Sequence, residues 1–86
     1  MSFVVQSLKA VSGTNIMDLG PQPIKMNGLQ IRTKIASALQ VPVTDIKITF
    51  DGGPMGDTET LEDVGVNLEG DQVSFTNATH GGFTEK

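Results

Sequence analysis

VPVTDIKITFDGG, residues 41–53, contains the clearest strand in the sequence together with a boundary on each side of it. Apolar and polar residues alternate with a period of two, as in a strand that buries only one face. The apolar positions are Ile46, Ile48 and Phe50, and the polar positions between them are Lys47 and Thr49. Because a residue before proline avoids the helical region, Pro42 separates this strand from any preceding helix, and the turn at residues 51–54 ends it. Lys47 and Thr49 are therefore expected on a solvent-exposed face.

A helix is predicted immediately before this strand. Asn27 and Gln30 have the three-residue spacing of a capping box, so the helix should begin here, and Val41-Pro42 should end it. Residues three and four positions apart share one face of a helix. The residues predicted to be buried on that basis are Ile31, Ile35, Ala38 and Leu39, and those predicted to face solvent are Arg32, Thr33, Ser37 and Gln40.

The remaining segments place strands on both sides of this helix. The predicted strands span residues 3–11, 16–19, 46–50 and 73–76. The first two should form a hairpin, and Gly20-Pro21-Gln22-Pro23 is expected to break its second strand, because proline donates no ladder hydrogen bond. Between the last two strands, the residues expected to point inward are Leu61, Val64 and Val66. This order predicts an α+β fold, with a mixed sheet rolled over one helix and its other face exposed to water.

Composition narrows the possible functions of the chain. Its 86 residues allow one domain, which lacks cysteine and must therefore be stabilised by an apolar core rather than by disulfides. Ten acidic residues against six basic ones give a net charge of −4, which disfavours binding to a nucleic-acid backbone. No apolar stretch approaches the length that spans a bilayer. We therefore expect a monomer of the cytoplasm, the nucleus or both, with protein partners, no nucleic acid and no membrane attachment.

The polar residues form no catalytic or metal-binding constellation that we recognise. His80 is the single histidine, and it adjoins two glycines that leave nothing to fix its ring for acid–base work. Asp51 and Glu62 occupy the first and twelfth positions of a calcium loop, but Gly53 and Met55 at the third and fifth positions have no side-chain oxygen. A group of nearby carboxylates is interpreted as a solvated acidic loop, and its members are Asp57, Glu59, Glu62 and Asp63. No enzymatic activity, metal or cofactor is predicted.

The order and spacing of these segments resemble those of the ubiquitin-like family. The resemblance runs from the helix LQIRTKIASAL through VPVTDIKITFDGG to Thr60-Leu61-Glu62-Asp63, which is similar to the family's TLSDY stretch. It continues through the last strand, and Gly81-Gly82 falls where ubiquitin has its terminal diglycine. The resemblance implies a β-grasp fold, a four- to five-stranded mixed sheet wrapped over one helix, in a domain of residues 1–76. A flexible tail of residues 77–86 would follow this domain.

For the function, the resemblance implies a precursor of a protein modifier. A processing protease would cut after Gly82 and remove Phe83–Lys86. Activating and conjugating enzymes would then join the Gly82 carboxylate to a lysine of a target protein. Gly81 and Gly82 are thus the implied processing and conjugation site, and the modifier itself would be a substrate rather than a catalyst.

The alternative is a ubiquitin-like domain that is not conjugated and that binds a docking partner noncovalently. Gly81-Gly82 would then be an ordinary flexible end, and the wet face of the sheet would be the interface. The residues predicted on that interface are Lys47 and Thr49 of the third strand, Thr76 of the last strand, and Lys9 beside them. Thr49 and Thr76 stand where ubiquitin has apolar residues of its recognition patch, so receptors that bury that patch should bind this chain poorly.

Overall fold

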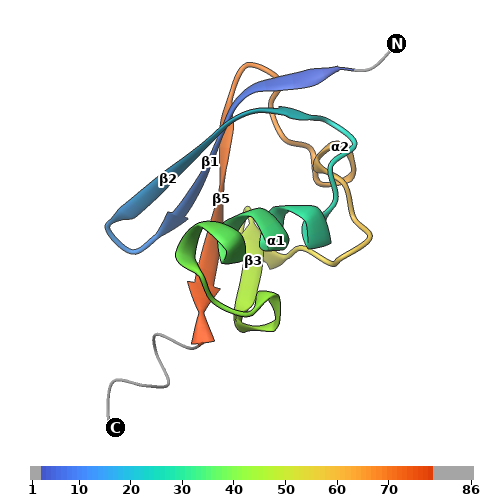
Figure 1. Cartoon of the computed structure of the whole chain (residues 1–86). Helices are drawn as coiled ribbons and strands as arrows, with labels where there is room; N and C mark the ends of the chain where they lie inside the picture. Colours follow the sequence, from blue (N-terminus) through green and yellow to red (C-terminus); the bar gives the residue numbers. More distant parts are fainter. Residues whose placement is uncertain (1–2, 79–86) are drawn as a thin grey trace, which may run out of the picture.

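One helix packs across one face of a five-stranded mixed sheet (Figure 1). The computed structural model describes residues 3–78 of the chain. The elements in chain order are β1 Val4–Ser12, β2 Asn15–Pro23, α1 Gly28–Leu39, the 3₁₀ turn η1 Val43–Asp45, β3 Ile46–Phe50, β4 Gly53–Pro54, α2 Leu61–Val64 and β5 Asp71–Asn77. The predicted α+β architecture, a mixed sheet wrapped over one main helix, is confirmed.

The first and last strands lie side by side in the middle of the sheet. The strand order is β2-β1-β5-β3-β4, in which β1 and β5 are parallel and the other pairs are antiparallel. Leu8 of β1 lies beside Asp71 of β5, and Val11 lies beside Ser74. Because β5 is flanked on both sides, its backbone position is fixed by two neighbouring strands.

The core fills the space between the sheet and α1. Its largest fully buried side chains are Val5, Leu8, Ile31, Ile35, Ile46, Leu61 and Val73. The predicted alternation in β3 is confirmed, because Ile46 and Ile48 are buried while Lys47 and Thr49 are exposed. Phe50 at the end of the strand is only half-buried. The sheet thus has one apolar face under the helix and one face in water.

Helix α1 has the boundaries that the sequence predicts. Asn27 Oδ1 accepts a hydrogen bond from the Gln30 N–H at 2.8 Å, and Gln30 Oε1 accepts one from the Asn27 N–H at 3.0 Å, which completes the capping box. The helix ends at Leu39, and Gln40 adopts the left-handed conformation with φ 60°. The chain has therefore left the helix before Val41-Pro42.

The buried face of α1 is shifted from the predicted one. Ala38 and Leu39 are exposed, contrary to the prediction, and Ala36 is buried instead. After the helix the chain folds back, so that the Val41 N–H donates to the Ala36 carbonyl at 3.0 Å, and Val41 and Val43 pack against the core cluster that contains Ala36. This return segment and η1 cover a side of the helix that residue spacing alone assigns to solvent.

The prediction that Arg32 faces solvent is wrong. Its side chain is only 17% exposed and forms an ion pair with Asp57. Its Nε donates to the Ile46 carbonyl at 2.9 Å, and its Nη2 donates to the Val43 carbonyl at 3.0 Å. Arg32 therefore ties α1 to the start of β3 and to the loop before α2. The other three polar positions predicted to face solvent are exposed, namely Thr33, Ser37 and Gln40.

Strand β2 continues through the segment predicted to break it. Pro21 and Pro23 belong to the strand, which pairs with β1 as far as Val4↔Pro23. They are tolerated because β2 is an edge strand, where a missing N–H can face the open side. Gly20 takes φ 72°, next to register shifts on either side of Leu8. The length of β2 therefore depends on its position at the edge of the sheet, and that position is set by the strand order of the whole sheet.

The segment between β4 and β5 packs inward as predicted. Leu61 and Val66 are buried and Val64 is half-buried. Thr60 and Asp63 form a second capping box, which starts the single turn of α2. The segment is held to the chain before α1, because the Leu61 and Glu62 N–H groups donate to the carbonyls of Met26 and Ile24 at 2.9 and 3.0 Å.

Candidate protein-binding face and conjugation site

The predicted binding residues of β3 and β5 lie together on the outward face of the sheet. In the antiparallel pair β3–β5, Lys47 is opposite Thr76 and Thr49 is opposite Ser74. Gln72 lies on the same side of β5, and all five residues are exposed. Since opposed residues have Cβ atoms about 4.5–5.5 Å apart, these side chains form one continuous surface. We call these five residues the β3–β5 face.

Lys9 shares this side of the sheet but lies at its far end. It sits on β1 beside Gln72, whereas Lys47 is opposite Thr76. Four residues of strand separate Gln72 from Thr76, a distance of about 13 Å. Lys9 is half-buried, and its ammonium donates to Ser7 Oγ at 3.4 Å. The structure therefore places Lys47, Thr49 and Thr76 in one cluster and Lys9 beside Gln72, at the opposite end of the β3–β5 face.

Two members of the β3–β5 face were not among the predicted site residues. Gln72 and Ser74 alternate with the buried Val73 and Phe75, so the period-two pattern of this strand contained the signal for both. Together the five side chains offer hydroxyl, amide and ammonium groups. The exposed large apolar side chains of residues 3–78 all lie on other elements. The β3–β5 face is therefore suited to a hydrogen-bonding partner rather than an apolar one.

Gly81 and Gly82, the predicted conjugation site, lie outside the described residues 3–78. The last described strand, β5, ends at Asn77, where it pairs with Ile46 at the start of β3. Gly81 follows Asn77 by four positions in the sequence. The sheet thus fixes the position of Asn77, which precedes Gly81 by four residues in the sequence.

The carboxylates considered for acid–base chemistry have structural partners. Asp57 forms an ion pair with Arg32, and Glu62 forms one with Lys25. The hydrogen bond from Lys25 to Glu62 and the charge of Glu62 raise the pKa of Lys25. The other two act through backbone contacts, since Glu59 accepts from the Gly56 N–H and Asp63 accepts from the Thr60 N–H. Within residues 3–78, no group of three or more His, Cys, Asp or Glu side chains is placed to hold a metal ion.

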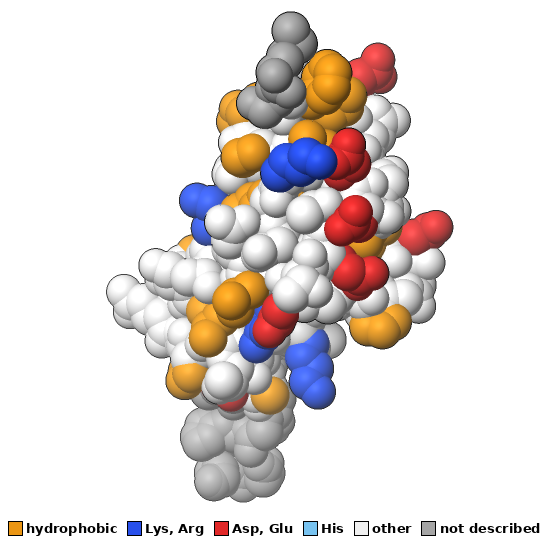
Figure 2. All heavy atoms as spheres, turned by 90° about the vertical axis from the view of Figure 1, so that its right-hand side faces the viewer, with side chains coloured by type: hydrophobic (Ala, Val, Ile, Leu, Met, Phe, Trp, Pro, Cys, Tyr) orange, Lys and Arg blue, Asp and Glu red, His pale blue; other side chains and the backbone are white. Residues whose placement is uncertain are grey.

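Acidic side chains gather on the side of the molecule that carries α2 and the loop before it (Figure 2). The exposed acidic residues of this segment are Asp57, Glu59, Glu62 and Asp63. In the part of the chain that the structure describes, no helix is long and apolar enough to cross a bilayer. The charge on this domain is therefore unevenly distributed, and its acidic side adjoins the segment between β2 and α1, where Glu62 pairs with Lys25.

Comparison with known proteins identifies similar folds but no similar sequence. Neither the models of known protein families nor the curated protein sequences gave a match. Among solved structures, the N-terminal ubiquitin-like domain in the 4931431F19Rik protein is similar with a TM-score of 0.76 and 14% identity, over 90% of this chain and 77% of that one. The ubiquitin of Caldiarchaeum subterraneum is similar with a TM-score of 0.74 and 25% identity, over 90% of this chain and 94% of that one.

These similarities agree with the sheet order, the single main helix and the sequence resemblance. A fold of this kind points to protein partners, although it names none of them. The chain therefore has a ubiquitin-like β-grasp fold.

Proposed function

We propose that this chain is the precursor of a ubiquitin-like modifier, cut after Gly82 and joined to target proteins through the carboxylate of that residue. The observation that carries the proposal is the position of Gly81-Gly82, only a few residues beyond the last strand of a ubiquitin-like domain. Glycine suits such a position because it lacks a Cβ, so an extended tail can enter a narrow active site with its carbonyl open to attack.

The chemistry would be performed by other proteins. A protease hydrolyses the peptide bond between Gly82 and Phe83 and leaves a free Gly82 carboxylate. An activating enzyme adenylates that carboxylate with ATP and releases pyrophosphate. Transfer to the ε-amine of a target lysine then forms an isopeptide bond and releases AMP. Before the cut, the amide to Phe83 occupies the reacting carbonyl, so the uncut precursor cannot be conjugated.

The test is the intact mass of N-terminally tagged protein expressed in its native cells, together with a blot for slower-migrating species. We expect loss of the residues after Gly82 and a ladder of conjugates. In Gly82→Ala the ladder should disappear while the domain stays folded. Gly53→Ala is the matched control, since a Cβ at Gly53 would come no closer than 3.9 Å to its nearest contact, the Phe50 carbonyl oxygen. A single uncut species without conjugates would contradict the proposal.

A second candidate function is noncovalent docking through the β3–β5 face. It is supported by the way that Lys47, Thr49 and Thr76 meet on paired strands, with Ser74 between them. Docking would survive Gly82→Ala and would be lost on Lys47→Glu. Conjugation would be lost on Gly82→Ala, and it would survive Lys47→Glu if the conjugating enzymes do not contact the β3–β5 face. Pull-down with each variant separates the two functions.

A further inference from the structure

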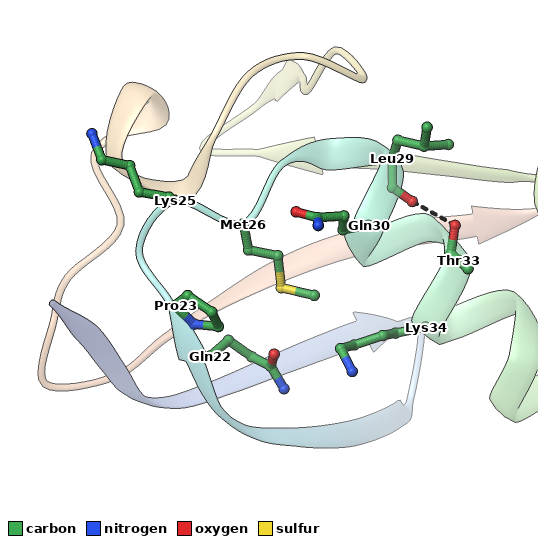
Figure 3. A pocket seen from close by; sticks show the side chains of 8 residues that line it. All are labelled: Gln22, Pro23, Lys25, Met26, Leu29, Gln30, Thr33 and Lys34. Atoms are coloured by element: carbon green, nitrogen blue, oxygen red, sulfur yellow. Dashed lines mark hydrogen bonds between the residues drawn. The ribbon is translucent and has the colours of Figure 1, made fainter. Parts of the chain in front are cut away.

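Asn27 and Gly28 form the only Asn-Gly pair in the chain, and the fold favours each residue for a separate reason. Asn27 is the N-cap of α1, and its Oδ1 accepts a hydrogen bond from the N–H of Gln30, whose side chain points back toward the start of the helix (Figure 3). Gly28 is buried, and a Cβ there would lie 2.2 Å from the Gly56 carbonyl oxygen. The cap therefore favours a residue such as asparagine, and the close approach of the loop requires glycine after it.

An asparagine followed by glycine is prone to deamidation, because glycine has no side chain to hinder attack by its backbone nitrogen. The Gly28 nitrogen loses its proton and attacks Cγ of Asn27, and the bond from Cγ to the side-chain nitrogen breaks with release of ammonia. Water then opens the five-membered succinimide at either of its carbonyls. The products are aspartate at position 27 and isoaspartate, in which the main chain runs through the former side-chain carbonyl.

The folded structure holds the two reacting groups apart. Asn27 has a ψ of 173°, whereas ring closure needs its side chain and the Gly28 nitrogen to be eclipsed about the Cα–C bond. Rotation into that arrangement pulls the Gly28 N–H away from the Glu59 carbonyl, to which it donates at 2.9 Å. The next N–H, of Leu29, donates to the Asp57 carbonyl at 3.2 Å. Ring closure therefore requires residues 57–59 to separate from the start of α1.

We propose that Asn27-Gly28 is a deamidation site that reacts only when this contact opens, and that its isoaspartate product prevents the contact from closing again. Isoaspartate adds one methylene to the main chain, which displaces Gly28 from the Glu59 carbonyl and removes the capping side chain. Aspartate keeps the cap, because it ranks with asparagine at this position and its charge is favoured at a helix N-terminus. The site thus converts a transient opening into a lasting loss of structure, and it does not depend on conjugation.

The first test compares the full chain at neutral pH in buffer and in enough guanidinium chloride to unfold it. Brief digestion with trypsin releases the site in the peptide MNGLQIR, residues 26–32. Chromatography with mass spectrometry then measures the asparagine, aspartate and isoaspartate forms. We expect the folded chain to deamidate at least about tenfold more slowly than the unfolded chain. Equal rates would overturn the dependence on opening, and an absence of reaction in the unfolded chain would overturn the site itself.

Two variants separate local opening from global unfolding. Asp57→Asn removes the ion pair with Arg32 that ties the loop to α1, and it should accelerate deamidation of the folded chain about threefold or more. Val73→Ala is the control, since it removes buried volume from β5, which pairs with β1 and β3. It should lower stability without changing the rate of deamidation. Equal acceleration by the two variants would assign the reaction to global unfolding and overturn the proposal, as would no acceleration by Asp57→Asn.

The last test concerns the products. The isoaspartate form is isolated after partial reaction, and amide hydrogen exchange is measured for Gly28 and Leu29. We expect both amides to lose their protection in the isoaspartate form and to keep it in Asn27→Asp, which carries the other product alone. Protected amides in the isoaspartate form would overturn the proposal. Loss of protection in Asn27→Asp would also overturn it, because the added methylene would then not be the cause.

Discussion

Replacing Gly28 by Ala should destabilise the domain although alanine is the better helix former. A Cβ on Gly28 would lie 2.2 Å from the Gly56 carbonyl oxygen and 3.0 Å from the carbon of that carbonyl. Both atoms belong to the backbone, so no side-chain rotation relieves the overlap and the loop must move. Two hydrogen bonds hold that loop to the helix, from the Gly28 N–H to the Glu59 carbonyl at 2.9 Å and from the Leu29 N–H to the Asp57 carbonyl at 3.2 Å.

The magnitude follows from these contacts. Overpacking costs about 1–3 kcal/mol, and weakening each of the two hydrogen bonds costs about 0.5–1.5 kcal/mol. The reduced backbone freedom of alanine in the unfolded chain returns about 0.4–1 kcal/mol. We therefore expect the free energy of unfolding to fall by about 3 kcal/mol, and the melting temperature by more than about 10 °C.

The assay is urea unfolding followed by circular dichroism, with thermal melting as a second measurement. Gly53→Ala is again the control, since its nearest contact at 3.9 Å is an ordinary van der Waals distance, and it should change stability by less than about 0.5 kcal/mol. A Gly28→Ala protein as stable as the unchanged chain would refute the close approach between the helix and the loop.

Three further predictions concern other parts of the fold and are tested by the same unfolding measurements. Arg32→Met removes the three side-chain contacts that tie α1 to its surroundings and should cost about 2 kcal/mol, so an unchanged stability would contradict them. Ala36→Lys should cost more than about 3 kcal/mol by burying a charge, whereas Leu39→Lys should cost less than about 1 kcal/mol, and equal costs would refute the shifted helix face. The pKa of Lys25 is raised above its ordinary value of 10.5 by the hydrogen bond and charge of Glu62. The stability advantage of the unchanged chain over Lys25→Met should therefore be complete below about pH 10 and disappear as the pH rises through the folded-state pKa, and a pH-independent difference would contradict the ion pair.

Local patterns were sufficient to predict the elements whose boundaries are set by neighbouring residues. The alternation around Lys47 and Thr49 identified β3 and its outward face, because one buried face imposes a period of two. Asn27 and Gln30 identified the start of α1, because a capping box is formed entirely by residues within the first turn. These features need no knowledge of distant segments.

Features that depend on distant segments were not predictable in this way. The burial of Ala36 and Arg32 arises from the return of the chain after α1, which residue spacing in a helix does not contain. The continuation of β2 through Pro21 and Pro23 depends on its position at the edge of the sheet. The contact between the start of α1 and residues 56–59 is likewise a consequence of the fold, since its two sides are far apart in the sequence.

The position of Lys9 on the outward face of the sheet is another feature that the local sequence pattern predicts only in part. Alternation in β1 places it on the outward side, since its neighbours Leu8 and Ala10 are buried. Its distance from Lys47 depends on the register of β5 between them, which pairs Lys9 with Gln72 and Lys47 with Thr76. Sequence patterns give the side of a strand, whereas register requires the assembled sheet.

The most direct test of the proposed function is the covalent bond itself. Between Lys47 and Gly82 the chain has no lysine or arginine, so trypsin would leave a long remnant on a target lysine, whereas cleavage before Asp71 leaves only DQVSFTNATHGG. Tagged protein purified from its native cells under denaturing conditions is digested on the amino side of aspartate and analysed by mass spectrometry. We expect branched peptides in which residues 71–82 are attached through Gly82 to a lysine of another protein. Finding only linear peptides that run from Asp71 through Phe83 would contradict the modifier function.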